Sequence, residues 1–415
     1  MTDGDRPFDL VLWGATGFTG SLVAEYLTRQ HGARAALRWA IGGRSQAKLE
    51  QVRDRLAALD TTAAELPIVL GDGADRASLD AIARKTRVVC STVGPFSKYG
   101  RELVAACVEA GTDYCDSTGE PQFVRAMIDA HHVQARATGA RIVPCCGFDS
   151  VPSDLGTLMM QEAARTAHGN PCGEVRHYVS LRGAGFSGGT AASMVQLMEE
   201  SARDPAVRRV MSDPYALDPD HGPGPTGAGM DLAPVRWDDD VQRWTGPFVM
   251  AGINARVVRR TNAMLAYAWG RDFHYVEGMS FASGPAGLLK AAGMAAGVAG
   301  ALGAMAVPPV RRFVADRFLP APGEGPSKEQ RDRSSFKSRF VGVLAGSGAR
   351  MHGTVTGVGD PGYDETAKML GESALCLARD RDATRTEGGV LTPASCLGMT
   401  LVQRLRKQGM TFDVT

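Results

Sequence analysis

Near its start the chain reads Val11-Leu12-Trp13-Gly14-Ala15-Thr16-Gly17-Phe18-Thr19-Gly20. The apolar residues at the front of this stretch are typical of a buried strand, and residues 21–27 have the pattern of an amphipathic helix. In such a turn the first glycine permits a sharp bend, the second lets backbone N–H groups approach a pyrophosphate, and the third lets the helix pack closely on the strand. The stretch therefore predicts a dinucleotide-binding turn, with the positive end of the helix dipole facing the anion.

The next strand indicates which nucleotide binds. Residues 37–41 have the pattern of a strand that ends in a glycine pair and Arg44. An NAD-binding protein typically has an acidic residue there for the ribose 2′-hydroxyl, whereas an arginine accommodates the 2′-phosphate of NADP. We therefore expect NADP(H), with Arg44 stacked on the adenine and Ser45 and Lys48 at the phosphate oxygens. The alternative is that Arg44 and Lys48 begin a solvated helix.

Two later loops complete the predicted cofactor site. Thr92-Val93-Gly94-Pro95 follows the fourth strand and should lie toward the nicotinamide, because ligands bind outside the carboxyl ends of strands where the sheet order reverses. Asp72, past the third strand, is either an acceptor for the adenine amino group or a turn aspartate. The predicted cofactor-binding residues are Gly14, Ala15, Thr16, Gly17, Phe18, Thr19, Gly20, Gly43, Arg44, Ser45, Lys48, Asp72, Thr92, Val93, Gly94 and Pro95.

Length and composition indicate a soluble enzyme of two domains. At 415 residues the chain exceeds what one core usually supports. Its 46 Lys and Arg nearly balance 45 Asp and Glu, so no nucleic-acid partner is expected. The first residues lack the pattern of a signal peptide, which favours the cytoplasm. The 8 cysteines include no Cys-x-x-Cys pair and the 8 histidines show no metal-ligand spacing, which predicts reduced thiols and no metal site.

Helix and strand patterns alternate through the first third of the chain, as a doubly wound sheet requires. The expected fold class is α/β. It comprises an N-terminal Rossmann domain over residues 1–150 and a second α+β domain, built on a mixed or antiparallel sheet, over residues 151–345. Residues 346–415 are expected to pack back on the first domain.

Six motifs in order resemble one family. They are GATGFTG at 14–20, STVGPF at 91–96, AGTDYCDSTGE at 110–120, CGFDSVPSD at 146–154, SGGT at 187–190 and GVLTPA at 389–394. They are similar to those of the saccharopine dehydrogenase-like oxidoreductases, and most similar to the mycobacterial trans-acting enoyl reductases, from about Phe8 to the C-terminus. The resemblance implies NADPH-dependent reduction of a carbon–carbon double bond in a polyketide or fatty acyl thioester, presented by a synthase carrier domain, in lipid biosynthesis. Animal members of the family associate with lipid droplets, so the resemblance also points to lipid chemistry.

An enoyl reductase also needs a proton donor and a group that stabilises the enolate. Polar loops at the carboxyl edge of the sheet supply the candidate catalytic residues, which are Tyr99, Tyr114, Asp149 and Ser150. Asp149 has a structural alternative, in which it caps the helix beginning near Val151 and orients Ser153. No Tyr-x-x-x-Lys pair follows the fourth strand, which disfavours a short-chain ketone reductase.

The middle of the chain should hold the substrate domain. Residues 175–182 alternate like an antiparallel strand, and Ser187-Gly188-Gly189-Thr190 opens a helix that either binds an anion or carbonyl oxygen or is simply capped. The Pro- and Gly-rich stretch 213–240 is a loop over the site or a plain connection.

Residues 291–307 carry no charge. As a helix they reach ~25 Å, short of the ~30 Å hydrocarbon core of a bilayer. We therefore expect a buried or homodimer-interface helix, with a peripheral contact to the inner face of a membrane or another lipid surface as the alternative.

Two other functions stay open. A saccharopine-type amino-acid dehydrogenase needs arginines for its substrate's carboxylates, and the sequence offers Arg176, Arg182, Arg256, Arg259 and Arg260. A non-catalytic NADP-binding protein at a lipid surface would keep the glycine turn and Arg44 but tolerate loss of the polar loops at 114–154. Those loops are intact, which favours an enzyme.

Overall fold

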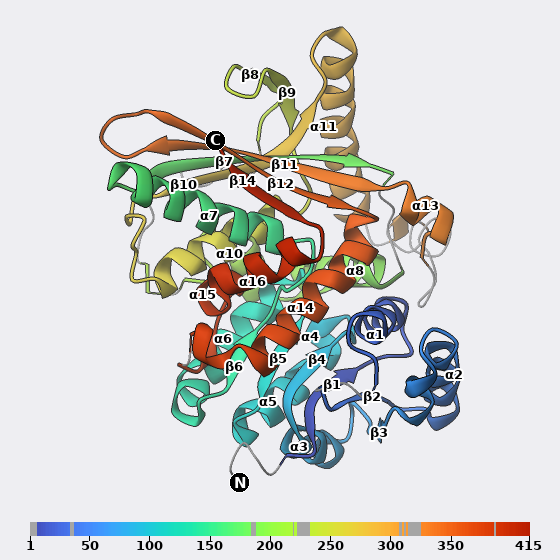
Figure 1. Ribbon diagram of the computed structural model, residues 1–415. Helices are drawn as coiled ribbons and strands as arrows, with labels where there is room; N and C mark the ends of the chain where they lie inside the picture. Colours follow the sequence, from blue (N-terminus) through green and yellow to red (C-terminus); the bar gives the residue numbers. More distant parts are fainter. Residues whose placement is uncertain are drawn as a thin grey trace.

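Two seven-stranded sheets, one above the other in Figure 1, organise the residues that the computed structural model describes, which are 6–33, 37–183, 188–218, 220–221, 233–306, 309–310, 313, 325–385 and 387–415. Helices fill the layer between the sheets. They include α7 (Val151–His168), α10 (Ala251–Met264), α14 (Thr366–Arg379) and α16 (Gly398–Lys407).

The first sheet is parallel and has the order β3-β2-β1-β4-β5-β6-β13. Its strands are β1 (Phe8–Trp13), β2 (Trp39–Gly43), β3 (Ile68–Leu70), β4 (Thr86–Ser91), β5 (Asp113–Asp116), β6 (Arg141–Val143) and β13 (Gly389–Val390). Their connections contain α1 (Phe18–His31), α2 (Gln46–Ala57), α3 (Arg76–Lys85), α4 (Phe96–Tyr99), α5 (Arg101–Ala110) and α6 (Pro121–Thr138). The strand order is that of a dinucleotide-binding domain, and the predicted α/β class is confirmed.

Burial of β1 shows why this sheet is covered on both faces. Leu10 and Leu12 belong to one hydrophobic core, whereas Val11 and Trp13 belong to another. Successive side chains of a strand point to opposite faces, so the four successive apolar residues Leu10–Trp13 require an apolar layer on each side.

The second sheet is mixed, as predicted, with the order β14-β12-β11-β7-β10-β9-β8. Its strands are β7 (Cys172–Arg182), β8 (Arg236–Asp238), β9 (Arg243–Gly246), β10 (His274–Phe281), β11 (Ser335–Leu344), β12 (Arg350–Val358) and β14 (Thr411–Val414). β7 and β10 are parallel, and the other pairs are antiparallel. Helix α7 packs tightly on this sheet, because a Cβ at Gly156 would lie 2.3 Å from the ring of Phe340.

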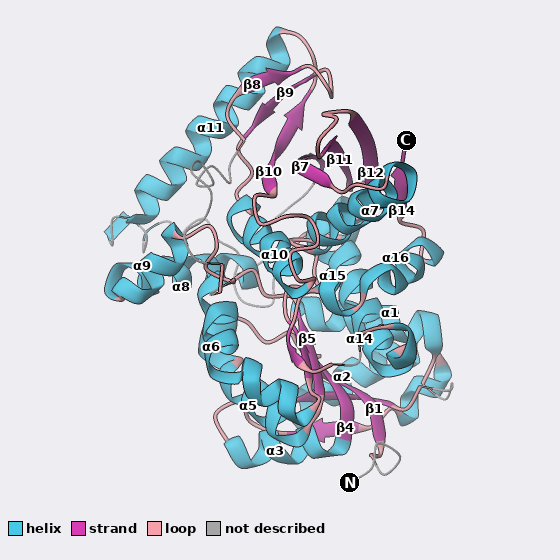
Figure 2. Cartoon of the chain, turned by 90° about the vertical axis from the view of Figure 1, so that its left-hand side faces the viewer, coloured by secondary structure: helices cyan, strands magenta, loops and turns pink. Residues whose placement is uncertain are grey.

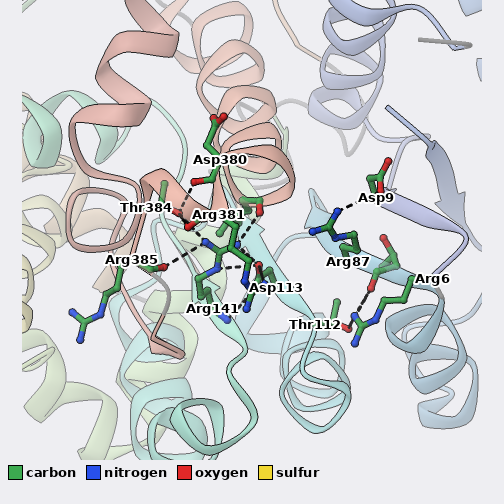
Figure 3. A network of polar contacts seen from close by, with 12 residues as sticks. Arg6, Asp9, Arg87, Thr112, Asp113, Arg141, Asp380, Arg381, Thr384 and Arg385 are labelled. Atoms are coloured by element: carbon green, nitrogen blue, oxygen red, sulfur yellow. Dashed lines mark hydrogen bonds and ion pairs between the residues drawn. The ribbon is translucent and has the colours of Figure 1, made fainter. Parts of the chain in front are cut away.

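The C-terminal part of the chain contributes strands to both sheets, β12 and β14 to the second and β13 to the first. Arg141, a fully buried residue at the start of β6, anchors this C-terminal part. Figure 3 shows the contacts of Arg141. The Arg141 guanidinium donates to Asp113 of β5 over 3.0 Å, to the Leu377 carbonyl over 2.7 Å and to the Thr384 hydroxyl over 2.9 Å. These bonds lie at the amino ends of the strands, opposite the predicted site.

The uncharged stretch lies in α11 (Pro285–Ala306), at the outer edge of the molecule (Figure 2). Leu289 is 73% exposed, and a Cβ at Gly293 or Gly297 would meet no atom within 4 Å. The helix is therefore not buried within the described chain, which corrects that part of the expectation, while the dimer and lipid contacts stay predictions. Among the helices in the described ranges, none has the length and apolarity needed to cross a bilayer.

Two other segments for which the sequence gives a prediction include residues that the structure does not describe. Helix α8 (Gly188–Arg203) begins at the predicted glycine pair, but Ser187 lies outside the described residues. Within the stretch 213–240, β8 is present and residues 222–232 are not described; Val307, the end of the uncharged stretch, is likewise outside the description.

Candidate active site

The glycine turn between β1 and α1 is shaped for the close approach of a phosphate. Gly14 has φ +92°, in the left-handed region that favours glycine, and a Cβ at Gly20 would lie 2.1 Å from the Gly14 carbonyl oxygen. No described side chain caps α1 at Gly17, so the first N–H groups of the helix stay available. These groups and the helix dipole fit a pyrophosphate. Of the other predicted turn residues, Ala15 is buried, Thr16 is exposed, and Phe18 and Thr19 are partly exposed.

The loop after β4 lies directly on this turn. The Thr92 hydroxyl is 3.2 Å from the carbonyl oxygens of both Trp13 and Gly14, to which it donates. A Cβ at Gly14 would lie 2.6 Å from Val93 Cγ2, and Gly94 is exposed beside it. The structure therefore brings together the two predicted parts of the cofactor site.

Glu120 fixes the far end of the loop, a role that sequence reasoning missed. Its buried carboxylate accepts from the N–H groups of Phe96 at 2.8 Å and Ser97 at 2.9 Å, and from the Ser193 hydroxyl of α8 at 2.8 Å. It thus caps α4, which follows Pro95, and ties α8 to the cofactor loop. The sequence did contain a signal for this role of Glu120, because it is an acidic residue at the end of a polar loop at the carboxyl edge of the sheet.

Arg44 and Lys48 lie exposed after β2, and neither makes an ion pair with the residues that the structure describes. Gly43 ends the strand, and the Ser45 hydroxyl accepts from the Lys48 N–H at 3.4 Å as the N-cap of α2. The two free cations fit a 2′-phosphate. Asp72 accepts from the Ala74 N–H at 3.0 Å, so it does form a turn, and its contact with adenine stays a prediction.

The two tyrosine candidates differ in access to the site. Tyr99 is 41% exposed, with Lys98 Nζ 5.0 Å from its ring centre. Tyr114 is fully buried on β5, and its hydroxyl donates to Asp116 over 2.8 Å. This geometry contradicts the prediction that Tyr114 acts directly on a substrate. The four-residue strand was too short for its alternation to show which face Tyr114 occupies.

Asp116 organises the loop that carries the remaining candidates. Its carboxylate accepts from the Thr118 N–H at 3.0 Å and from the Cys145 N–H at 3.2 Å, so it joins the loops after β5 and β6. Cys145 has φ +65°, a left-handed conformation that costs energy in a residue with a Cβ. Burial raises the pKa of Asp116 to about 7.

Asp149 is the acidic candidate that remains accessible. The residue is partly exposed, and a Cβ at Gly119 would lie 3.5 Å from its Oδ2. The capping alternative is wrong, because no side chain among the described residues caps α7 at Ser150 and the Ser153 hydroxyl donates to Glu277. No donor among the described residues bonds the Asp149 carboxyl. Burial, with a contribution from the negative charge of Glu277, raises its pKa to about 6.

Ser150 is buried, unlike its neighbour. Its hydroxyl donates to Asn254 Oδ1 of α10 over 3.0 Å. Ser150 therefore faces the interior, which contradicts the prediction of direct contact with a substrate.

Most of the arginines that a saccharopine-type enzyme would need are engaged elsewhere. Those of α10 hold the segment after α9 (Pro205–Ser212) by its carbonyl oxygens: Arg256 donates to Asp213 at 2.9 Å, Arg259 to Pro214 at 3.0 Å and Arg260 to Leu217 at 2.6 Å. Arg176 pairs with Asp238 at 2.6 Å, and Arg182 lies exposed at the end of β7. This arrangement argues against a substrate with several carboxylates.

Comparisons with known proteins show the family to which the chain belongs. The family model described as the saccharopine dehydrogenase NADP binding domain matches residues 10–143. A trans-acting enoyl reductase of Mycobacterium bovis is 40% identical over 100% of this chain and 99% of its own length. A Mycobacterium tuberculosis protein named provisionally for the same activity is 43% identical over the same shares.

Among solved structures, a saccharopine dehydrogenase has a similar fold over nearly the whole chain. Saccharopine dehydrogenase (L-Glu forming) from Saccharomyces cerevisiae matches with a TM-score of 0.53 and 12% identity, over 98% of this chain and 99% of that chain. At this identity the likeness concerns the fold alone.

Proposed function

This chain belongs to the family of the trans-acting enoyl reductases, NADP-binding oxidoreductases with a saccharopine dehydrogenase-like domain, and from this premise we propose that it reduces the carbon–carbon double bond of an enoyl thioester with NADPH. The relatives' name, trans-acting enoyl reductase, supports an enoyl substrate that another protein carries, and we propose a polyketide or fatty acyl chain for it. The observation that carries the proposal is the accessible, protonatable Asp149 carboxyl at the edge of the sheet where the cofactor loops end.

The chain's own residues fit NADPH, which supplies a hydride when bound. The N–H groups at the start of α1 would hold the pyrophosphate, and Arg44 with Lys48 would hold the 2′-phosphate. The loop 92–95, fixed by Glu120, would lie along the nicotinamide half.

Asp149 would complete the reduction. Hydride addition at the β-carbon of an enoyl thioester leaves an enolate, and a proton delivered to the α-carbon gives the saturated thioester and NADP⁺. Asp149, with a pKa of about 6, keeps a fraction of its carboxyl protonated near neutrality and regains its proton from solvent through its exposed edge.

The test is NADPH consumption with trans-2-enoyl thioesters on coenzyme A and on a carrier domain. We expect turnover by the full chain and a loss of about 100-fold or more in Asp149→Asn, with NADPH affinity unchanged. Asp129→Asn, on the exposed face of α6, is the matched control and should keep full turnover.

Tight NADPH binding without consumption of any enoyl thioester would refute the reductase and favour a non-catalytic NADP-binding protein. Full activity in Asp149→Asn would refute the assigned proton donor.

A further inference from the structure

A carboxylate lies in the core of the protein, where the proposed reaction does not yet use it. Glu277 is on β10 and is 0% exposed. An ionised side chain is expensive to bury unless donors surround it. Tyr275 and Glu277 occupy the buried face of β10, toward the layer of helices that includes α7 and α10.

Three donors from three elements converge on Glu277. Asn254 Nδ2 of α10 donates to Oε1 over 2.8 Å, and the Ser153 hydroxyl of α7 donates to the same oxygen over 3.2 Å. The Tyr275 hydroxyl of β10 donates to Oε2 over 2.8 Å. Such a set of donors is the environment of an ionised carboxylate.

The network continues on both sides of the carboxylate. On one side His177 Nδ1 of β7 lies 3.1 Å from the Tyr275 hydroxyl and 3.5 Å from Glu277, and its ring stacks on Phe340. On the other side the Asn254 amide, with its nitrogen held by Glu277, turns its oxygen toward the Ser150 hydroxyl at 3.0 Å. Ser150 is the residue next to Asp149.

This path links a buried charge to the accessible end of the site. Because Asn254 donates to Glu277, its oxygen is the atom left for Ser150, and Ser150, the residue just before α7, is held in one orientation. Asp149 itself lies beside the loop of Gly119 and has no donor among the described residues. The negative charge that acts on it is that of Glu277.

Building on the proposed reduction, we propose that Glu277 is a positioning residue, which orients Ser150 through Asn254 and supplies the buried negative charge beside which Asp149 serves as the proton donor. The other charged or titratable groups around Glu277 are Tyr275, His177, Asp154 of α7 and Arg259 of α10, which donates to the Tyr275 carbonyl at 3.5 Å.

The decisive variant is Glu277→Gln, which keeps the volume and an acceptor for Asn254 while it removes the charge. The full chain, labelled with ¹³C at aspartate carboxyls, is titrated by NMR, and the signal absent from Asp149→Asn identifies Asp149. Removal of a like charge favours the ionised carboxylate, so we expect the Asp149 midpoint to fall by about half a pH unit or more. In turnover, the alkaline limb of the pH profile should shift by the same amount, with NADPH affinity unchanged.

Glu372→Gln is the matched control. Glu372 is equally buried but binds Tyr26 and Arg404 on the side of α14, so its replacement should leave the Asp149 midpoint where it is. If Glu277→Gln does not fold, Tyr275→Phe keeps the Glu277 charge but removes one of the donors that offset it, so the Asp149 midpoint should rise.

An unchanged midpoint in the folded Glu277 or Tyr275 variant would overturn the role of Glu277. This readout needs no substrate, so it differs from failure of the proposed function, which would show as a wild-type chain that binds NADPH and reduces no enoyl thioester.

Discussion

Replacing Gly17 and Gly20 with alanine, one at a time, separates stability from cofactor binding in the glycine turn. A Cβ at Gly20 would lie 2.1 Å from the Gly14 carbonyl oxygen and 2.7 Å from the Thr92 hydroxyl, whereas ordinary contact begins at 3.4 Å. Helix α1 must then move about 1 Å from the turn, and overpacking of this kind costs about 1–3 kcal/mol. Gly20→Ala should therefore lower the free energy of unfolding by that amount and weaken NADPH binding as well.

Gly17→Ala should affect cofactor binding more than stability. The Cβ would lie 3.4 Å from the Gly14 carbonyl oxygen, and φ is −77°, which alanine adopts without strain. Because Gly17 is the N-cap of α1, where alanine is less favourable than glycine, we expect an unfolding free energy within about 1 kcal/mol of the wild type. The methyl group would occupy the approach of the pyrophosphate, so NADPH affinity should fall about 10-fold or more. Urea unfolding without nucleotide and NADPH fluorescence titration measure the two effects. Equal destabilisation by both variants, or wild-type NADPH affinity in Gly17→Ala, would refute the reasoning.

Three further changes test other parts of the molecule. Arg44→Ala should weaken NADPH about 10- to 100-fold, because charge-assisted bonds to the 2′-phosphate contribute about 1.5–3 kcal/mol, and should leave NADH unchanged; equal losses in a titration with both nucleotides would contradict the assignment. Arg141→Ala leaves the buried Asp113 carboxylate without its main partner and should lower the unfolding free energy by about 3–5 kcal/mol in urea; a loss below about 1 kcal/mol would mean that Arg381, 3.4 Å away, replaces it. Burial raises the pKa of Asp154 from its ordinary value of 3.8 to about 7. The stability that its protonated form contributes is therefore complete below about pH 4 and is lost as the pH rises through 7. Asp154→Asn should flatten this decline of the unfolding free energy in a series of urea unfolding curves, and an unchanged slope would contradict the assignment to Asp154.

The parts of the molecule that the sequence predicts well depend on local patterns. The strand, glycine and helix succession around Gly14 identifies the cofactor turn, because each glycine has a steric function within ten residues of chain. The place of Arg44 after the second strand led to the prediction of NADP(H), the cofactor that the family model supports. The alternation of helices and strands gives the α/β class, and the six motifs indicate the family.

The rest depends on contacts between distant residues. Ser153 bonds Glu277, which is 124 positions away, and no local pattern indicates that pair. A charged residue on the inward face of the alternating strand 274–281 was a signal that could have pointed to Glu277. An uncharged run such as 291–307 has the same composition whether it is buried or exposed, so the exposure of α11 required coordinates.

The position of β13 affects how the chain is made. Gly389 and Val390 cover the edge of β6, whose last residue is Val143, so nearly 250 residues separate neighbouring strands. At roughly 5–20 residues per second, a ribosome needs about 12–50 seconds to cover that distance. Throughout this interval the nascent first sheet has an open edge, the kind of surface that pairs with other strands and that chaperones shield.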